Sequence, residues 1–198
     1  AETMQDEDSN LYYCIKHIFQ AVPDIVPKKI WIEMMLFDYL IGNADRHQSN
    51  WGLLARVSTD RHAIRLRRCP LYDNGSSLCC YVNESQLAAY DGKDIRRFNA
   101  LVDSKSKSII RIDGTTKNRP THSDVVRYLL SQYPDIVTKT ASNFIRILTP
   151  DAVNALLEQY PDSILSEAKK RLIYRYLCRK VELLEQILAG KDHLNGNE

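Results

Sequence analysis

Apolar residues recur at helical spacing over residues 27–41 of the chain. One face of this segment carries Ile30, Met34, Phe37 and Ile41. These positions follow one another at intervals of three and four, which predicts a helix. Further apolar residues lie on the other faces, so we expect this helix to be buried on most sides. Gly42-Asn43 predicts its end, because both residues tolerate the left-handed backbone conformation that follows a helix.

Two shorter stretches alternate between apolar and polar residues and predict a β-hairpin. Residues 51–57 and 62–68 are the expected strands, and residues 58–61 join them. In the second strand, apolar residues alternate with arginines, as in a strand with one solvated face. A basic stripe results, which consists of Arg61, Arg65, Arg67 and Arg68. We interpret the stripe as the solvated face of the hairpin; an acidic partner or a nucleic acid is the alternative.

The remainder of the chain has helical patterns. Besides a helix over residues 10–20, we expect helices over roughly 85–91, 94–102, 123–132, 138–147, 151–159 and 163–189. Thr149-Pro150-Asp151 is a helix start, with a capping residue, a proline at the first helical position and an acid in the first turn. The last helix is expected to end at Gly190. Its basic residues are interpreted as its solvated face: Lys169, Lys170, Arg171, Arg175, Arg179 and Lys180.

A short motif occurs twice, as Leu-Leu-x-Gln-Tyr-Pro-Asp at residues 129–135 and 156–162. Two copies do not make a solenoid, which needs about three repeats. We therefore expect two helices that end in the same way, with a packed tyrosine and a proline that stops the helix.

Length and composition indicate one ordinary globular domain that covers residues 1–198. The chain is 44% hydrophobic and 26% charged, and its net charge of +2 is too small to indicate nucleic-acid binding. No stretch approaches the roughly 20 apolar residues of a membrane span. The five cysteines are odd in number and have no C-x-x-C spacing, so a reducing cytoplasm is the expected location.

Two short motifs carry the chemistry. Asp45 and Asn50 have the spacing D-x-x-x-x-N directly after the expected buried helix, and Asp73-Asn74-Gly75 follows the second expected strand. In phosphoryl transfer from ATP, one aspartate meets the attacking hydroxyl, while an asparagine and a second aspartate hold the metal on the phosphates. Either motif alone is weak, because a surface aspartate after a helix and a tight D-N-G turn are both common.

Because of the expected hairpin, the two motifs together indicate a phosphoryl-transfer site more strongly than either motif does alone. Asn50 precedes the first strand and Asp73 follows the second, and an antiparallel hairpin brings those ends together. Their oxygen atoms suit Mg²⁺, and Gly75 would let the backbone turn sharply beside Asp73. His47 could orient Asp45, contact phosphate or hydrogen-bond the backbone, and we favour a supporting role.

These residues resemble a known family. The segments Phe37–Leu54 and Cys69–Leu78 are similar to the C-terminal lobe of HipA-like kinases, bacterial serine/threonine kinases of which some are toxins of toxin–antitoxin systems. The same strings also resemble secretory-pathway kinases and, more loosely, phosphatidylinositol kinases. The resemblance implies Asp45 as the catalytic aspartate, Asn50 and Asp73 as Mg²⁺ ligands, ATP as cofactor and a protein serine or threonine as acceptor. It also implies a mainly α kinase-like C-terminal lobe with one β-hairpin that carries the metal-binding loops.

The chain has no glycine-rich phosphate loop, although a kinase needs a lobe that covers the phosphates. In HipA-like kinases that lobe precedes the catalytic one, and about 45 residues before Asp45 are too few for it. We expect the N-terminal lobe to act in cis or in trans, and this chain alone to be inactive. An antitoxin is a further expected partner. The alternatives are a lipid or small-molecule kinase and a non-catalytic kinase-like binding module.

Overall fold

The computed structural model describes residues 11–21, 26–58, 63–90 and 95–190. The elements in chain order are α1 (Ile15–Ala21), α2 (Lys28–Ile41), the 3₁₀ turn η1 (Gln48–Asn50), β1 (Leu53–Ser58), β2 (Ala63–Arg68), the 3₁₀ stretch η2 (Glu84–Tyr90), α3 (Ile95–Val102), α4 (His122–Gln132), α5 (Pro134–Ile147), α6 (Pro150–Leu157) and α7 (Glu167–Leu188). Within this part of the chain, the expected combination of a mainly helical fold with one β-hairpin is confirmed.

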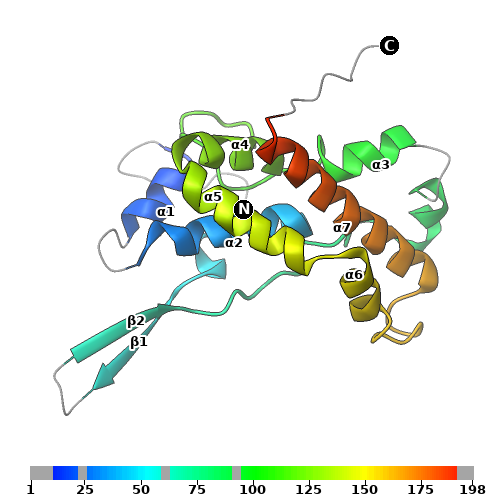
Figure 1. Ribbon diagram of the computed structural model, residues 1–198, viewed down its shortest axis with the longest axis horizontal. Helices are drawn as coiled ribbons and strands as arrows, with labels where there is room; N and C mark the ends of the chain where they lie inside the picture. Colours follow the sequence, from blue (N-terminus) through cyan, green and yellow to red (C-terminus); the bar gives the residue numbers. More distant parts are fainter. Residues whose placement is uncertain (1–10, 22–25, 59–62, 91–94, 191–198) are drawn as a thin grey trace.

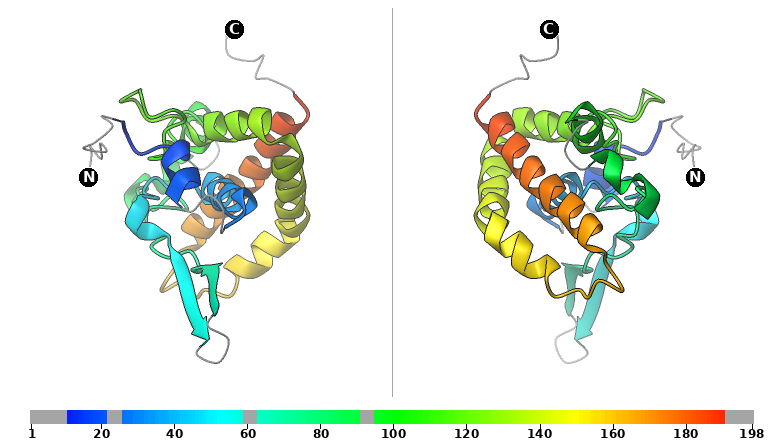
Figure 2. Two further views of the ribbon diagram at one scale, coloured as in Figure 1. Left: turned by 90° about the vertical axis from the view of Figure 1, so that its left-hand side faces the viewer. Right: turned by 90° about the vertical axis from the view of Figure 1, so that its right-hand side faces the viewer.

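Helix α2 lies in the middle of the helical body, and later helices surround it (Figure 2). It packs against α1, α4, α5 and α7, and eight of its fourteen residues are buried. The chain leaves α2 at Gly42, which has the left-handed φ of 66° that the sequence predicts for this position. The residues that follow are therefore attached to the most enclosed helix of the fold, which gives the next loop a rigid base.

A second core cluster lies where α7 meets η2, α3 and α6. Val102, Val153 and Leu172 are among its buried members. The main cluster instead joins α1, α2, α4 and α5 and includes Leu184 near the end of α7. Helix α7 thus contributes to both clusters along its 22 residues and holds the two halves of the helical body together.

The hairpin β1–β2 projects from the helical body (Figure 1). Its antiparallel register pairs Leu53 with Arg68 and Leu54 with Arg67, so these pairs lie on opposite faces. Leu53 packs against the main core, whereas Val57 near the tip is 65% exposed. The expected solvated stripe is correct for Arg67, which is exposed, and wrong for Arg68, which is half-buried on the other face. Arg61 and the side chain of Arg65 lie outside the described residues.

Several boundaries differ from expectation. Residues 84–90 form a 3₁₀ stretch rather than an α-helix, and only Leu87 in it is buried, so few tertiary contacts favour a longer helix. Helix α1 begins at Ile15, because the residues before it pair with backbone elsewhere: Tyr12 N–H donates to Gly114 O and Arg111 N–H to Tyr13 O. Among the described helices, none is long and apolar enough to cross a membrane.

The repeated motif does not end its two helices in the same way. Pro134 is the first residue of α5, so this proline starts a helix instead of stopping one, and α5 begins four residues earlier than expected. Tyr133 is half-buried against the main core, whereas Tyr160 lies beyond α6 and is 46% exposed. The start of α6 is as predicted, with the Thr149 side chain accepting from Ala152 N–H.

Candidate active site

Asp45 and Asn50 lie on the loop that leaves α2. Asn50 is buried in η1, and its side-chain amide donates to the Asp45 carbonyl at 2.8 Å. The Asp45 N–H in turn donates to the Asn43 side-chain oxygen at 3.1 Å. Since the amide nitrogen of Asn50 is used inside the loop, its Oδ1 is the atom that remains for a ligand. The Asp45 carboxylate itself is half-buried.

Arg46, next to Asp45, joins the two predicted motifs. Its side chain is only 1% exposed. Nη1 donates to the carbonyls of Asn50 and Tyr72 at 2.8 Å each, and Nη2 donates to the Asn74 side chain at 2.5 Å. One guanidinium thus holds the backbone beside Asn50 and the backbone beside Asp73. The structure brings the two motifs together as the hairpin argument predicts, and Arg46 is the residue that sequence reasoning left without a role.

The charge of Arg46 is balanced by Asp38 on α2. The carboxylate receives Nε at 3.2 and 3.0 Å and Nη2 at 2.8 Å. Burial raises the pKa of Asp38, and the hydrogen bonds from Arg46 act in the opposite direction. The signal in the sequence was that Asp38 is the one charged residue in the segment from Met34 to Ile41, because a buried carboxylate requires a charged or hydrogen-bonded partner.

The Asp73 loop has a strained backbone at the proposed metal ligand. Asp73 has a φ of 52°, and its side chain is exposed. We expected Gly75 to make the sharp turn, but the left-handed residue is Asp73 itself. Such a conformation costs a non-glycine residue on the order of 1 kcal/mol and persists where the surroundings enforce it. Here Ala44 N–H donates to Ser76 O at 3.1 Å and Leu78 N–H to Ile41 O at 2.8 Å, which fixes this loop beside the first.

His47 supports the loop. Its Nδ1 accepts the Ser49 N–H at 3.2 Å, and the residue is the N-cap of η1. This contact fits the supporting role that we favoured from the sequence. The ring is half-buried.

A second set of buried groups holds the same loop from the other side. His122 Nε2 lies 2.9 Å from the Asn43 carbonyl and Nδ1 lies 3.0 Å from the Ser106 carbonyl, so the ring spans two backbone acceptors. His122 Nδ1 is 3.0 Å from Ser106 Oγ, which also receives Lys180 Nζ at 3.1 Å. Burial, and then the nearby Lys180, lower the pKa of His122 to about 3, so the imidazole is neutral near pH 7. This role of His122 could not be predicted from the sequence, because the histidines form no spacing pattern.

Lys180 overturns the expectation that all basic residues of the last helix are solvated. Its side chain is fully buried, lies 4.4 Å from the centre of the Tyr39 ring, and has Tyr176 on another side. Burial lowers the pKa of Lys180 to about 7. A shift of one or two positions moves a residue from the solvated to the buried face of an amphipathic helix, so the pattern alone does not distinguish a solvated lysine from a buried one.

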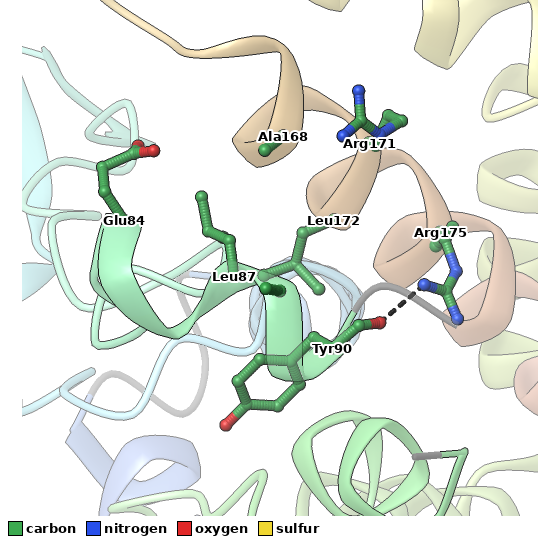
Figure 3. Close-up of a pocket in the computed structure, with 8 residues that line it drawn as sticks. Glu84, Leu87, Tyr90, Ala168, Arg171, Leu172 and Arg175 are labelled. Carbon is green, nitrogen blue, oxygen red and sulfur yellow. Dashed lines mark hydrogen bonds between the residues drawn. The ribbon is translucent and has the colours of Figure 1, made fainter. Parts of the chain in front are cut away.

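The chain that follows Asp73 is anchored along α7. Lys169 Nζ donates to the Cys79 carbonyl at 2.5 Å and the Val82 carbonyl at 2.8 Å. Farther on, Arg175 donates to the Tyr90 carbonyl at 2.6 Å, across a hollow of about 240 Å³ between η2 and α7 (Figure 3). Leu87 and Leu172 line this hollow. The segment from the Asp73 loop to η2 is therefore held to the helical body at several points.

The available donor set fits a magnesium ion that is shared with phosphate. Asn50 Oδ1 and the Asp73 carboxylate are hard oxygen ligands, which Mg²⁺ prefers. Within residues 11–21, 26–58, 63–90 and 95–190, no three His, Cys, Asp or Glu side chains gather into a site of their own. Mg²⁺ in kinase sites is typically held by one or two protein carboxylates together with substrate phosphates, so this small set is adequate.

Comparisons with known proteins find a similar sequence and a similar fold. No family model matches the chain. It is 28% identical over 141 residues to the serine/threonine-protein kinase CtkA of Helicobacter pylori, a match that covers 66% of this chain and 41% of the relative. It also matches the crystal structure of a Helicobacter pylori proinflammatory kinase CtkA with a TM-score of 0.72 and 16% identity, over 95% of this chain and 64% of that one.

The two matches confirm the resemblance to a HipA-like serine/threonine kinase and the kinase-like fold class. At 16% identity the structural match shows the fold alone. The chain spans about two fifths of the length of the curated relative that it matches.

Proposed function

We propose that this chain is the catalytic half of an ATP- and Mg²⁺-dependent kinase that phosphorylates a protein serine or threonine. The observation that carries the proposal is the contact of Arg46 with both motifs, through the Asn50 and Tyr72 carbonyls at 2.8 Å each. This contact between the D-x-x-x-x-N loop and the D-N-G loop supports the proposal, because phosphoryl transfer from ATP needs the catalytic aspartate and the metal ligands close together. The sequence similarity to a serine/threonine-protein kinase supports the acceptor class.

Each residue has a defined task in this proposal. Asp45 accepts the proton of the attacking hydroxyl. The oxygen of that hydroxyl bonds to the γ-phosphorus, while the bond between the γ-phosphorus and the oxygen that bridges it to the β-phosphate breaks. Asn50 and Asp73 would hold Mg²⁺, and the bound ion would neutralise phosphate charge. Arg46 and His47 keep the loop in position. The phosphates require a covering lobe as well, which we assign to another polypeptide segment, in cis or in trans.

Intact-mass spectrometry of the full-length gene product after incubation with Mg-ATP tests the proposal. We expect an added mass of phosphate in the wild type and none in Asp45→Asn or Asp73→Ala, while all three proteins keep the same circular dichroism spectrum. Asp135→Asn, an exposed aspartate at the start of α5, is the matched control and should be phosphorylated like the wild type. Equal phosphorylation in the Asp45 or Asp73 variant would refute the assignment of these residues.

The acceptor class is tested by the same preparation. A protein mixture and lipid vesicles that contain phosphatidylinositol are offered separately with labelled ATP. Label in protein alone supports the proposal, and label in lipid alone would replace it by a lipid kinase. If neither is labelled, a nucleotide-binding measurement separates a kinase with an untested substrate from a binding module.

A further inference from the structure

We propose that Lys180 is a positioning residue for the loop that carries Asp45. Its charged amine, acting through the Ser106 hydroxyl, selects the tautomer of His122 whose Nε2–H holds the Asn43 carbonyl. This inference rests on the function proposed above, because that function makes Asp45 the acceptor of the hydroxyl proton. The geometry that carries it is a continuous row of buried polar groups from α7 to this loop.

The His122 ring faces more acceptors than it has protons. Nε2 lies 2.9 Å from the Asn43 carbonyl, and Nδ1 lies 3.0 Å from the Ser106 carbonyl. A carbonyl can only accept, and a neutral imidazole has a single N–H. Because burial and the nearby Lys180 lower the pKa of His122 to about 3, the ring is neutral near pH 7. Only one of the two carbonyls can therefore receive a proton from the ring, and only the Nε2–H tautomer holds the loop.

The two carbonyls do not need that proton equally. The Ser106 carbonyl already receives the backbone N–H of His122 at 2.9 Å. Among the described residues, the Asn43 carbonyl has the ring as its one donor, and Asn43 is 1% exposed. A buried acceptor that is left without a donor costs stability. The Nε2–H tautomer gives each carbonyl a donor and leaves Nδ1 as an acceptor.

The charge of Lys180 favours this tautomer through the Ser106 hydroxyl. A protonated amine can only donate, and Nζ donates to Ser106 Oγ at 3.1 Å. The hydroxyl then turns its own hydrogen to His122 Nδ1 at 3.0 Å, since its other neighbour, the Tyr176 hydroxyl, lies farther away at 3.5 Å. A neutral amine instead has a lone pair that accepts the hydroxyl hydrogen. The row of hydrogen bonds can then reverse, with Nδ1 carrying the ring proton and donating to Oγ.

Asn43 transmits the choice of tautomer to Asp45. Its side-chain oxygen accepts the Asp45 N–H at 3.1 Å, and its side-chain amide donates to Asp38 at 3.2 Å. In the Nε2–H tautomer, the Asn43 carbonyl is held as well. In the other tautomer, the lone pairs of Nε2 and of the carbonyl oxygen face each other across 2.9 Å. Their repulsion displaces the Asn43 backbone, and with it Asp45 two residues later.

The surroundings of Lys180 allow both charge states near neutral pH. Among the described residues, the titratable side chains around its amine come from several parts of the fold: Tyr39 on α2, Cys79 after the Asp73 loop, Asp103 after α3, His122 on α4 and Tyr176 on α7. Asp103 and the two tyrosine ring faces favour the charged amine. Burial acts against it and lowers the pKa of Lys180 to about 7. The amine therefore changes its charge over a range in which the His122 ring stays neutral.

Nitrogen NMR of the full-length gene product, labelled with ¹⁵N in histidine, measures the tautomer directly. The His122 signals are identified by their loss in His122→Gln. In the wild type, we expect the ring proton on Nε2 at pH 6 and a shift of that proton towards Nδ1 at pH 9. Lys180→Met should show the same tautomer ratio at both pH values, because no amine remains to titrate. Lys139→Met, which removes an exposed lysine of α5, is the matched control and should behave like the wild type.

Ser106→Ala tests the path between the two residues. This variant keeps the Lys180 amine and removes the hydroxyl that lies between the amine and His122. The tautomer ratio should again be independent of pH, whereas a direct effect of the Lys180 charge on the ring would persist and would overturn the proposed path. Circular dichroism shows that each variant is folded.

Phosphate transfer at the same pH values connects the tautomer with the reaction. Between pH 6 and pH 9, kcat of the wild type should fall about threefold to tenfold relative to Lys180→Met, which is the effect of losing one hydrogen bond. A wild-type tautomer that does not change with pH would overturn the proposal, and so would a constant ratio of the two kcat values. Absence of transfer by the wild type at every pH would refute the kinase and the positioning role with it. Because NMR reads the tautomer without any activity, the two failures are distinguishable.

Discussion

Replacing Arg46 by methionine should destabilise the fold by about 3–5 kcal/mol, because it leaves the buried Asp38 carboxylate without its partner. Arg46 makes three contacts of 2.8–3.2 Å with that carboxylate and three more with the two site loops. Methionine replaces the unbranched stem of the arginine side chain and removes all six contacts. Since domains of this size are stable by about 5–15 kcal/mol, the loss is a large fraction of the total.

Urea denaturation followed by far-ultraviolet circular dichroism measures this loss. In Arg46→Met the free energy of unfolding should be closer to the wild-type value at pH 5 than at pH 8. The buried Asp38 has a raised pKa without the guanidinium and takes up a proton as the pH falls, which removes the unpaired charge. Asp38→Asn in the same background should recover part of the lost stability at pH 8, because no buried charge is left.

A cost below 1 kcal/mol for Arg46→Met would refute the reasoning. Additive effects of the Arg46 and Asp38 substitutions would refute it as well, since groups in direct contact couple. Arg46→Lys is the control for charge alone. Lysine keeps the charge but lacks the planar fork that reaches three segments at once, so it should restore less than half of the loss.

Two further substitutions test the buried groups around the loop of Asp45 and Asn50. Lys180→Met should raise the free energy of unfolding most at pH 7 and below, and by about 2 kcal/mol less at pH 9. With its pKa lowered to about 7, Lys180 has lost its proton in the folded state at pH 9 but keeps it in the unfolded state, so the wild type itself gains stability over this interval. Parallel stability curves from urea denaturation at pH 7 and pH 9 would contradict this expectation. Gly42→Ala should cost about 1–3 kcal/mol, because Gly42 has a φ of 66° and a β-carbon there would collide with the Tyr176 hydroxyl. The cost should be smaller in a Tyr176→Phe background, and an equal cost in thermal unfolding would show that the hydroxyl is not the obstacle.

The sequence predicted those parts of the molecule that depend on local pattern. The spacing of apolar and polar residues along the chain predicts helix α2, its end at Gly42 and the β-hairpin. Asp45, Asn50 and Asp73 could be proposed because kinase chemistry restricts which residue types serve it. That the hairpin would bring the last two together followed from antiparallel geometry alone.

The contacts that fix the site could not be predicted, because they join residues far apart in the chain. Arg46 reaches a backbone carbonyl 26 residues away, and His122 reaches one 79 residues away. Every residue has the same backbone carbonyl, so the sequence does not indicate which carbonyl a side chain will contact. Lys180 was misplaced for a related reason, since its surroundings come from Tyr39 and Ser106 on other segments.

The support of the active-site loop by Lys180 and its neighbours has a consequence for protein synthesis. The Tyr39 hydroxyl of α2 donates to the Lys180 carbonyl, which lies 141 residues later in the chain. The Ser106 hydroxyl likewise accepts a hydrogen bond from the Lys180 amine, which is synthesised much later. A ribosome adds about 5–20 residues per second, so α2 emerges many seconds before α7 can meet it. During that interval the contacts of Tyr39 and Ser106 with Lys180 are missing. The nascent chain therefore carries Asp45, Asn50 and Asp73 well before α7 completes the buried contacts behind their loop.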